Sequence, residues 1–194
     1  MLGGFRRYHE HFSVPIDTMP VAMPINLRTA ADAAGGNRFA AARFAAPVAE
    51  PDPRERMQQV REFVITARAE PAINAATLLS PALSHLPGSL VARILASLTS
   101  NNDAQVSNVP GIPYPVYMAG ARITRMYPFG PLPGCAAMIT LISHDGMCCI
   151  GINMDAAAIT DPALFQRSLS KGIDEVLALS STPPARRSAR DNAP

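Results

Sequence analysis

Apolar residues recur at helical spacing in the first segment of the chain. Leu2, Phe5, Tyr8 and Phe12 are separated by three or four residues, which predicts a helix over Met1–Phe12. No N-cap residue precedes this helix. We therefore expect a domain that is truncated at its N-terminal side.

Two further helices carry the same kind of start signal. Asp52 and Asp161 each precede a proline, so that an N-cap is followed by the residue favoured at the first helical position. The first of these helices should end at Pro71. The expected buried faces are Met57, Val60, Val64 and Ala67 in the first helix and Leu164, Phe165, Leu169, Ile173 and Val176 in the second. Thr77–Ser100 is a further helical stretch, interrupted by prolines.

Extended segments alternate with the helices. The expected strands are Val21–Leu27, Arg38–Val48, Gln105–Asn108, Val116–Met126, Ala136–Ser143 and Met147–Met154. Pro24 favours an edge or a bulge in the first strand. Phe39 and Phe44 cannot share one face of a regular strand, so the second strand should have a bulge or two buried faces. His144-Asp145-Gly146 is typical of a hairpin turn between the last two strands.

This order of elements predicts the α/β class, with a mixed sheet flanked by helices. We expect one domain over residues 1–180. The segment 181–194 has no apolar periodicity and is expected to be a disordered tail.

Composition narrows the functional classes. Charged residues are only 16% of the chain and apolar residues 48%, which leaves room for an apolar interface. A net charge of +2 without a basic stripe gives no sign of a nucleic-acid partner. Cys135, Cys148 and Cys149 do not form a disulfide framework, and the N-terminus does not resemble a signal peptide. No apolar run approaches the ~20 residues of a spanning helix. We expect a cytoplasmic protein. A peripheral contact of this protein with the inner membrane or with lipid bodies is a second, separate expectation.

Five short blocks then carry a resemblance to a known family. They are PINLR at 24–28, GNRFAAARFAAPV at 36–48, SNVPG at 107–111, AGARITRMYPFGPL at 119–132 and DPALFQRSL at 161–169. In this order and spacing they resemble the C-terminal domain of the bacterial wax ester synthase/diacylglycerol acyltransferase (WS/DGAT) family, especially its actinobacterial branch. The family often has Tyr where His144 stands.

The resemblance implies the C-terminal half of a chloramphenicol-acetyltransferase-like, CoA-dependent acyltransferase fold. In that fold a tunnel crosses between two similar halves. A histidine of an HHxxxDG motif in the first half deprotonates the acceptor hydroxyl, which attacks a long-chain acyl-CoA. The implied products are triacylglycerol or wax ester, made from diacylglycerol or a fatty alcohol. Acyl-CoA is a substrate, and no separate cofactor is implied.

The catalytic motif itself is missing. The four histidines, His9, His11, His85 and His144, include no adjacent pair. We expect the chain to contain no catalytic residue and to be inactive without an N-terminal catalytic half. Two other interpretations stay open: a non-catalytic domain that binds a full-length homologue or a lipid surface, and a product without activity.

Four residues are candidate substrate-binding positions, namely Ser107, Asn108, Gly111 and Gly120. The resemblance implies that Ser107 and Asn108 of the SNVPG block donate hydrogen bonds to the acyl carbonyl, the pantetheine arm or a neighbouring loop. The alternative is that Asn-x-Pro-Gly is ordinary turn chemistry, in which Gly111 tolerates positive φ. Gly120 is expected in a strand, either as a small-residue floor of the tunnel or as a packing contact with a helix. His144 is interpreted as an exposed turn residue. We expect no metal site, since His9 and His11 diverge on a helix.

Overall fold

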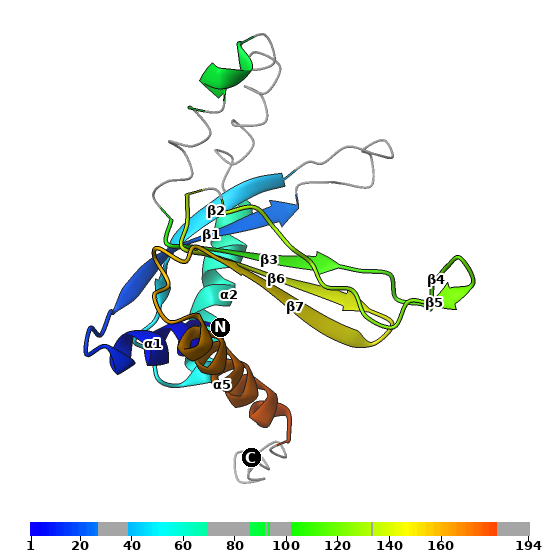
Figure 1. The fold of residues 1–194 in the computed structure, drawn as a ribbon. Helices are drawn as coiled ribbons and strands as arrows, with labels where there is room; N and C mark the ends of the chain where they lie inside the picture. Colours follow the sequence, from blue (N-terminus) through cyan, green and yellow to red (C-terminus); the bar gives the residue numbers. More distant parts are fainter. Residues whose placement is uncertain (27–38, 70–85, 92, 94–101, 133, 182–194) are drawn as a thin grey trace, which may run out of the picture.

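A five-stranded mixed sheet forms the centre of the molecule (Figure 1). The structure is a computed structural model that describes residues 1–26, 39–69, 86–91, 93, 102–132 and 134–181. The strand order is β2-β1-β3-β6-β7. Pairing is antiparallel at both ends of the sheet and parallel on the two sides of β3. The strands are β1 (Thr18–Asn26), β2 (Phe39–Pro47), β3 (Ala104–Pro110), β6 (Ala137–His144) and β7 (Met147–Met154).

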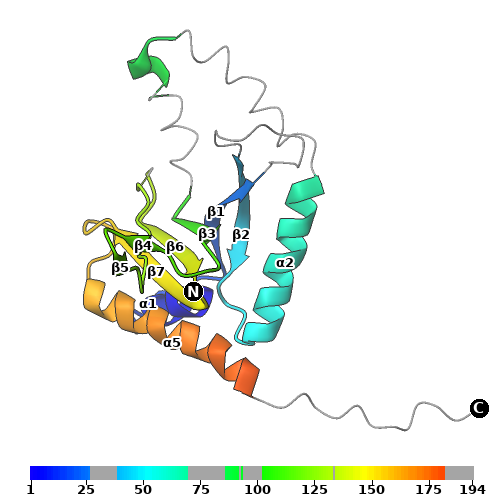
Figure 2. The ribbon, with the colours of Figure 1, turned by 90° about the vertical axis from the view of Figure 1, so that its right-hand side faces the viewer.

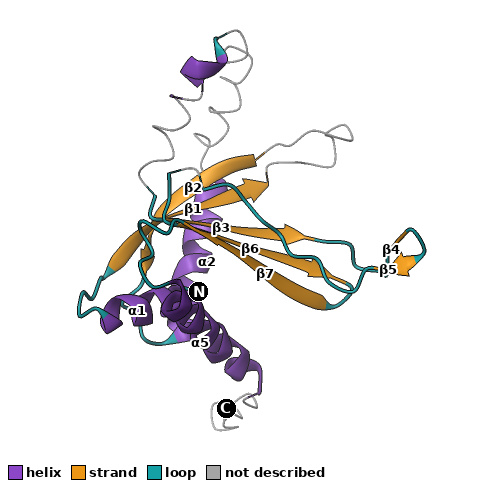
Figure 3. Ribbon diagram, in the orientation of Figure 1, coloured by secondary structure: helices purple, strands orange, loops and turns teal. Residues whose placement is uncertain are grey.

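Three helices cover one face of this sheet. They are α1 (Leu2–His11), α2 (Pro53–Ala69) and α5 (Pro162–Ser181). Figures 2 and 3 show α2 standing beside β2, while α1 and α5 lie together across the other strands. Among the residues that the structure describes, no helix is both long and apolar enough to cross a bilayer.

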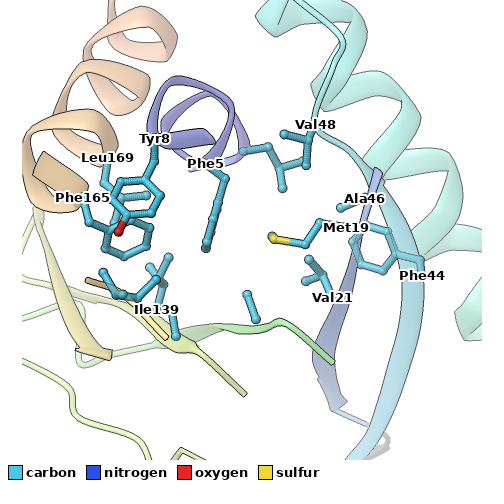
Figure 4. Close-up of a cluster of buried hydrophobic side chains, with 14 residues drawn as sticks. Phe5, Tyr8, Met19, Val21, Phe44, Ala46, Val48, Ile139, Phe165 and Leu169 are labelled. Atoms are coloured by element: carbon cyan, nitrogen blue, oxygen red, sulfur yellow. The ribbon is translucent and has the colours of Figure 1, made fainter. Parts of the chain in front are cut away.

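The core fills the space between the sheet and α1 and α5 (Figure 4). Phe165 of α5 is completely buried, and its ring meets those of Phe5 and Tyr8 edge-on at 5.1 and 5.3 Å. The two predicted helix caps are confirmed, because Asp52 Oδ1 accepts a hydrogen bond from the Arg54 amide and Asp161 Oδ1 accepts one from the Leu164 amide, each at 2.8 Å. The two helix starts that were predicted from the Asp-Pro pairs are therefore correct.

The strand β2 differs from its predicted form. Its register against β1 is continuous over nine residue pairs, so the expected bulge is wrong. Exposed and buried residues alternate from Ala41 to Ala46, so this part of the strand has one buried face, which contains Phe44. The side chain of Phe39 is not among those that the structure describes. The first strand, β1, is not an edge strand, since it lies between β2 and β3. Its pairing with β3 covers only Val21 and Ala22, so Pro24 sits where no ladder bond to β3 is needed.

The predicted strand Val116–Met126 is also wrong. In its place a short hairpin pairs β4 (Tyr117–Met118) with β5 (Ala121–Arg122). Ala119 and Gly120 form its turn with φ of +48° and +83°. The turn before β7 is confirmed, with Asp145 and Gly146 at φ of +46° and +77°.

Other predictions have mixed outcomes. On α2, Val60, Val64 and Ala67 turn inward as expected, but Met57 is exposed and its neighbour Arg56 is buried. Of the stretch 77–100 only residues 86–91 and 93 are described, and 88–91 and 93 are helical. The expected tail lies outside the described residues from 182 onward.

Candidate functional site

An apolar groove of about 540 Å³ opens between α5 and the sheet. It is bounded by β3, β6 and β7 on one side and by the inner face of α5 on the other. None of the lining residues in the described part of the chain is charged; they are Met1, Val106, Ser107, Ile139, Leu141, Cys148, Ile150, Ile152, Leu169, Ile173, Val176 and Leu177. A groove with this lining favours hydrocarbon or an apolar protein segment over a polar ligand.

One of the four predicted substrate-binding residues lines this groove, and a second follows it directly in β3. Ser107 belongs to its lining. Strand alternation directs the Ser107 side chain away from the face that Val106 occupies, so Ser107 borders the groove with its backbone. Asn108 pairs with Leu141, which places it on the groove side, and it is exposed. Asn108 thus follows the lining residues of β3 without being one of them, and its role toward a substrate stays a prediction.

Gly111 is explained by close packing. A Cβ built at this residue would lie 1.8 Å from the carbonyl oxygen of Ser143 in β6. Its φ is outside the left-handed region, so the expectation that Gly111 serves a positive-φ turn is wrong. Only glycine allows the chain after β3 to approach β6 this closely.

The segment around Pro128–Gly130 packs on the second face of the sheet. A Cβ at Gly151 of β7 would lie 1.6 Å from the Pro128 carbonyl oxygen, and a Cβ at Gly130 would meet the side chain of Met138 at 2.7 Å. The second half of the block AGARITRMYPFGPL therefore packs directly on β6 and β7, with a glycine on each side of the contact.

His144 is buried, not exposed, and the turn interpretation is wrong. It ends β6 with 2% of its surface exposed. Its Nδ1 lies 3.0 Å from the Ile112 carbonyl oxygen and its Nε2 lies 3.2 Å from that of Ile123. An imidazolium donates to both carbonyls, whereas the neutral ring donates to one. His144 thus connects β6 to the segments that precede and follow the β4–β5 hairpin.

We expect His144→Ala to lower the free energy of unfolding by roughly 2–4 kcal/mol, because the buried ring leaves a cavity and the Ile123 carbonyl loses its imidazole partner. The Ile112 carbonyl still accepts a hydrogen bond from the Asp145 amide. Urea unfolding followed by circular dichroism measures this loss. Asp145→Asn is the matched control: it weakens only the exposed Asp145–Arg122 ion pair and should cost at most about 1 kcal/mol. Equal stability of His144→Ala and the unmodified chain would show that these contacts contribute nothing.

The β4–β5 hairpin extends away from the sheet (Figure 1). Gly120 lies at its tip, where a Cβ would meet no atom within 4 Å. Both expected surroundings of Gly120, a strand floor and a helix contact, are therefore wrong, while its role toward substrate stays a prediction. Large apolar side chains are exposed on this hairpin and its flanks: Ile112, Tyr114, Tyr117, Met118, Tyr127 and Phe129.

A cluster of three arginines surrounds one carboxylate at the start of α1. Arg7 donates to Glu175 of α5, Arg56 Nη2 lies 3.3 Å from it, and Arg6 lies 3.9 Å away. The hydrogen bond from Arg7 lowers the pKa of Glu175, and burial lowers the pKa of Arg56. Sequence reasoning missed this cluster, since its members come from three helices that are far apart in the chain.

The α-amino group of Met1 lies within this positive field. The pKa of this amine is lowered from 8.0 to about 6, mainly because the group is buried and secondly because Arg56 is positively charged. Between pH 6 and 8 the unfolded chain therefore binds more protons than the folded one, so stability should rise with pH by roughly 2–3 kcal/mol. Urea unfolding from pH 5.5 to 8.5 measures the rise. N-terminal acetylation should remove it, and identical profiles with and without the acetyl group would contradict the assignment.

Comparison with solved structures defines the class of fold. The wax ester synthase/diacylglycerol acyltransferase of Marinobacter aquaeolei VT8 superposes with a TM-score of 0.60 at 20% identity, over 93% of this chain and 41% of that one. The starter condensation domain of rhizomide synthetase matches with a TM-score of 0.51 at 14% identity and the same coverage. The chain thus has the CoA-dependent acyltransferase type of fold, and the fold-class prediction is confirmed.

Sequence comparison then gives the family. The model of the WS/DGAT C-terminal domain matches residues 35–176. A Mycobacterium tuberculosis protein provisionally named diacylglycerol O-acyltransferase is 45% identical over 186 residues, which are 96% of this chain and 38% of that protein. Another from the same organism is 35% identical over 73% of this chain and 33% of its own length. The chain belongs to the WS/DGAT family, and it spans less than two fifths of these relatives.

Proposed function

We propose that this chain is the C-terminal part of an acyl-CoA-dependent O-acyltransferase that makes triacylglycerol or wax ester. The family match over residues 35–176 carries the proposal, because it includes both the SNVPG block beside the apolar groove and the segment laid over the second sheet face. The general base would come from an HHxxxDG motif in an N-terminal part. His144 is not a substitute base, since both of its ring nitrogens already face carbonyl oxygens.

In this proposal the chain contributes binding and orientation. The amide of Asn108 would donate to the thioester carbonyl or to the pantetheine arm, and the backbone at Ser107 would border the acyl chain. Gly111 would hold the following segment against β6, which keeps the end of β3 in place.

A second candidate function is a non-catalytic domain that binds a full-length homologue or a lipid surface. The exposed apolar residues around the β4–β5 hairpin favour it, among them Tyr117, Met118 and Phe129, which are 66–73% exposed. Such a patch marks an interaction surface. Sedimentation with phosphatidylglycerol vesicles, compared between the chain and Met118→Asp, tests the lipid form of this candidate.

The test of the first proposal is complementation. The chain is mixed with the separately expressed N-terminal part of the 45%-identical relative, and radiolabelled palmitoyl-CoA is supplied with hexadecanol or dioleoylglycerol. We expect ester formation from the mixture and none when the HHxxxDG histidines of the added part are replaced by alanine. A stable complex of the two parts that forms no ester would reject the enzymatic function and leave the binding function.

Gly120 gives a prediction within the complemented enzyme. If the hairpin tip faces the acceptor chain, Gly120→Leu should raise the ratio of decanol to hexadecanol turnover by about tenfold or more, since a misfit of one methylene is worth ~1–3 kcal/mol. Gly120→Ala shares the backbone strain at φ +83° but adds little bulk, so it should keep the original ratio. An unchanged ratio in Gly120→Leu would remove Gly120 from the substrate-binding residues.

A further inference from the structure

The β4–β5 hairpin has a defined shape although it extends away from the sheet (Figures 1 and 3). Ala119 and Gly120 both have positive φ, as the two central residues of a type I′ turn do. At the base of the hairpin, the ring nitrogens of His144 lie 3.0 and 3.2 Å from the carbonyl oxygens of Ile112 and Ile123. The fold therefore presents the hairpin in an ordered form without help from a partner.

The segment 111–132, which contains the hairpin, has the composition of a protein–protein interface. It includes three of the four tyrosines of the chain, both Met118 and Met126, Phe129 and two arginines, and it has no Asp, Glu, Lys or Ser. Tyr, Phe, Met and Arg are enriched at such interfaces, whereas the four residue types that the segment lacks are depleted there. The three tyrosines are Tyr114, Tyr117 and Tyr127, and they are 55–66% exposed.

Apolar side chains lie on both faces of the hairpin. Tyr117 pairs with Arg122, and Met118 pairs with Ala121. Because successive residues of a strand point to opposite faces, Tyr117 and Met118 lie on opposite faces, and they are 66% and 70% exposed. A hairpin that lies flat on a membrane or on a protein surface needs only one apolar face. Two apolar faces fit a partner that has two walls.

Two features favour protein over lipid as the material of these walls. The tip of the hairpin consists of the small residues Ala119–Ala121, so that end-on insertion into lipid would bury little apolar surface there. Among the described strands, β4 and β5 pair only with each other, which leaves their outer backbone groups without a ladder partner. Lipid offers no hydrogen bond to such groups, whereas a protein strand or loop does.

We propose that the β4–β5 hairpin inserts into a cleft of the N-terminal part of a WS/DGAT enzyme, with Tyr117 and Met118 as anchors on its two faces. This inference rests on the proposed function and names the contact that joins its two parts. The relatives contain such a part, because this chain covers only 38% of the 45%-identical protein. A hairpin that is ordered in advance loses little conformational freedom on binding, which favours a tight contact.

Oxidative footprinting of Met118 tests the contact. A chimaera joins the N-terminal part of the 45%-identical relative to this chain, and hydroxyl radicals oxidise the chimaera and the isolated chain in parallel. Mass spectrometry of the digested proteins gives the oxidation rate of Met118, and an added methionine peptide corrects for the radical dose. We expect the rate to fall by about tenfold in the chimaera, because methionine oxidation follows exposure.

Matched variants show whether the hairpin carries the association. A protease site at the junction of the chimaera frees the two parts, whose dissociation constant is then measured. Met118→Asp should raise this constant by about tenfold or more, as the loss of an interface anchor does. Met57→Asp makes the same exchange on α2, where Met57 is 45% exposed, and should change it by about twofold at most. Both residues are exposed, so neither exchange should alter the circular dichroism of the isolated chain.

Three results would overturn the inference. They are an unchanged oxidation rate of Met118 in the chimaera, equal weakening by Met118→Asp and Met57→Asp, and protection of Met118 by phosphatidylglycerol vesicles but not in the chimaera. The last would assign the hairpin to a lipid surface. The proposed function fails separately, since neither measurement needs turnover. A chimaera that protects Met118 but forms no ester would reject the function alone, and an active chimaera with a fully reactive Met118 would reject the inference alone.

Discussion

Gly111→Ala should destabilise the folded chain by about 3 kcal/mol or more, because the added methyl group would overlap backbone atoms of β6. The added Cβ would lie 1.8 Å from the Ser143 carbonyl oxygen and 2.9 Å from its carbon, both backbone atoms of β6. A backbone inside a sheet cannot rotate away as a side chain can, so the strand or the loop must shift. Urea unfolding of the variant measures the loss.

Gly120→Ala is the control for that result. Gly120 lies nine residues further along the chain, in another block of the resemblance. Its Cβ would enter open space, and only its φ of +83° is unfavourable for alanine. The expected cost is about 1–2 kcal/mol. Equal losses in the two variants would contradict the packing explanation. The predicted contact of Gly111 with substrate is not decided by this experiment and stays a prediction.

The isolated chain is expected to show no acyl transfer from palmitoyl-CoA to hexadecanol or dioleoylglycerol above a no-protein control. A positioned general base contributes ~10²–10⁴-fold, and the histidine that would supply it belongs to the HHxxxDG motif. Thin-layer separation of the labelled esters measures the reaction. Clear turnover by the chain alone that persists in His144→Ala would mean that another group replaces the base.

Local signals predicted most of the secondary structure. The Asp-Pro pairs located two helix starts because capping involves only neighbouring residues. The apolar runs at 136–143 and 147–154, joined by a turn sequence, located the last hairpin. The strand predicted at Val116–Met126 was wrong because this segment folds into a short hairpin whose residues are exposed or half-buried, so its apolar side chains follow no single period. Arg56 was missed because its partner Glu175 lies 119 residues away.

The candidate site was predictable only through the resemblance. Composition gave no reason to single out Ser107 or Asn108, whereas the SNVPG block pointed to the strand end that borders the groove. His144 could have been placed by continuing the strand alternation one residue further, since Met138 and Thr140 on the same face are buried as well. The groove itself needed the structure, because its lining comes from four elements and Met1.

Titration of the two parts against each other tests the central claim most directly. The N-terminal part of the 45%-identical relative is held at a fixed concentration well above its dissociation constant, and this chain is added stepwise while ester formation is measured. We expect no ester at zero addition, a linear rise, and a plateau at one equivalent of the chain. Turnover that is already present with either part alone, or that does not change as the chain is added, would contradict the claim that this domain completes a two-part acyltransferase.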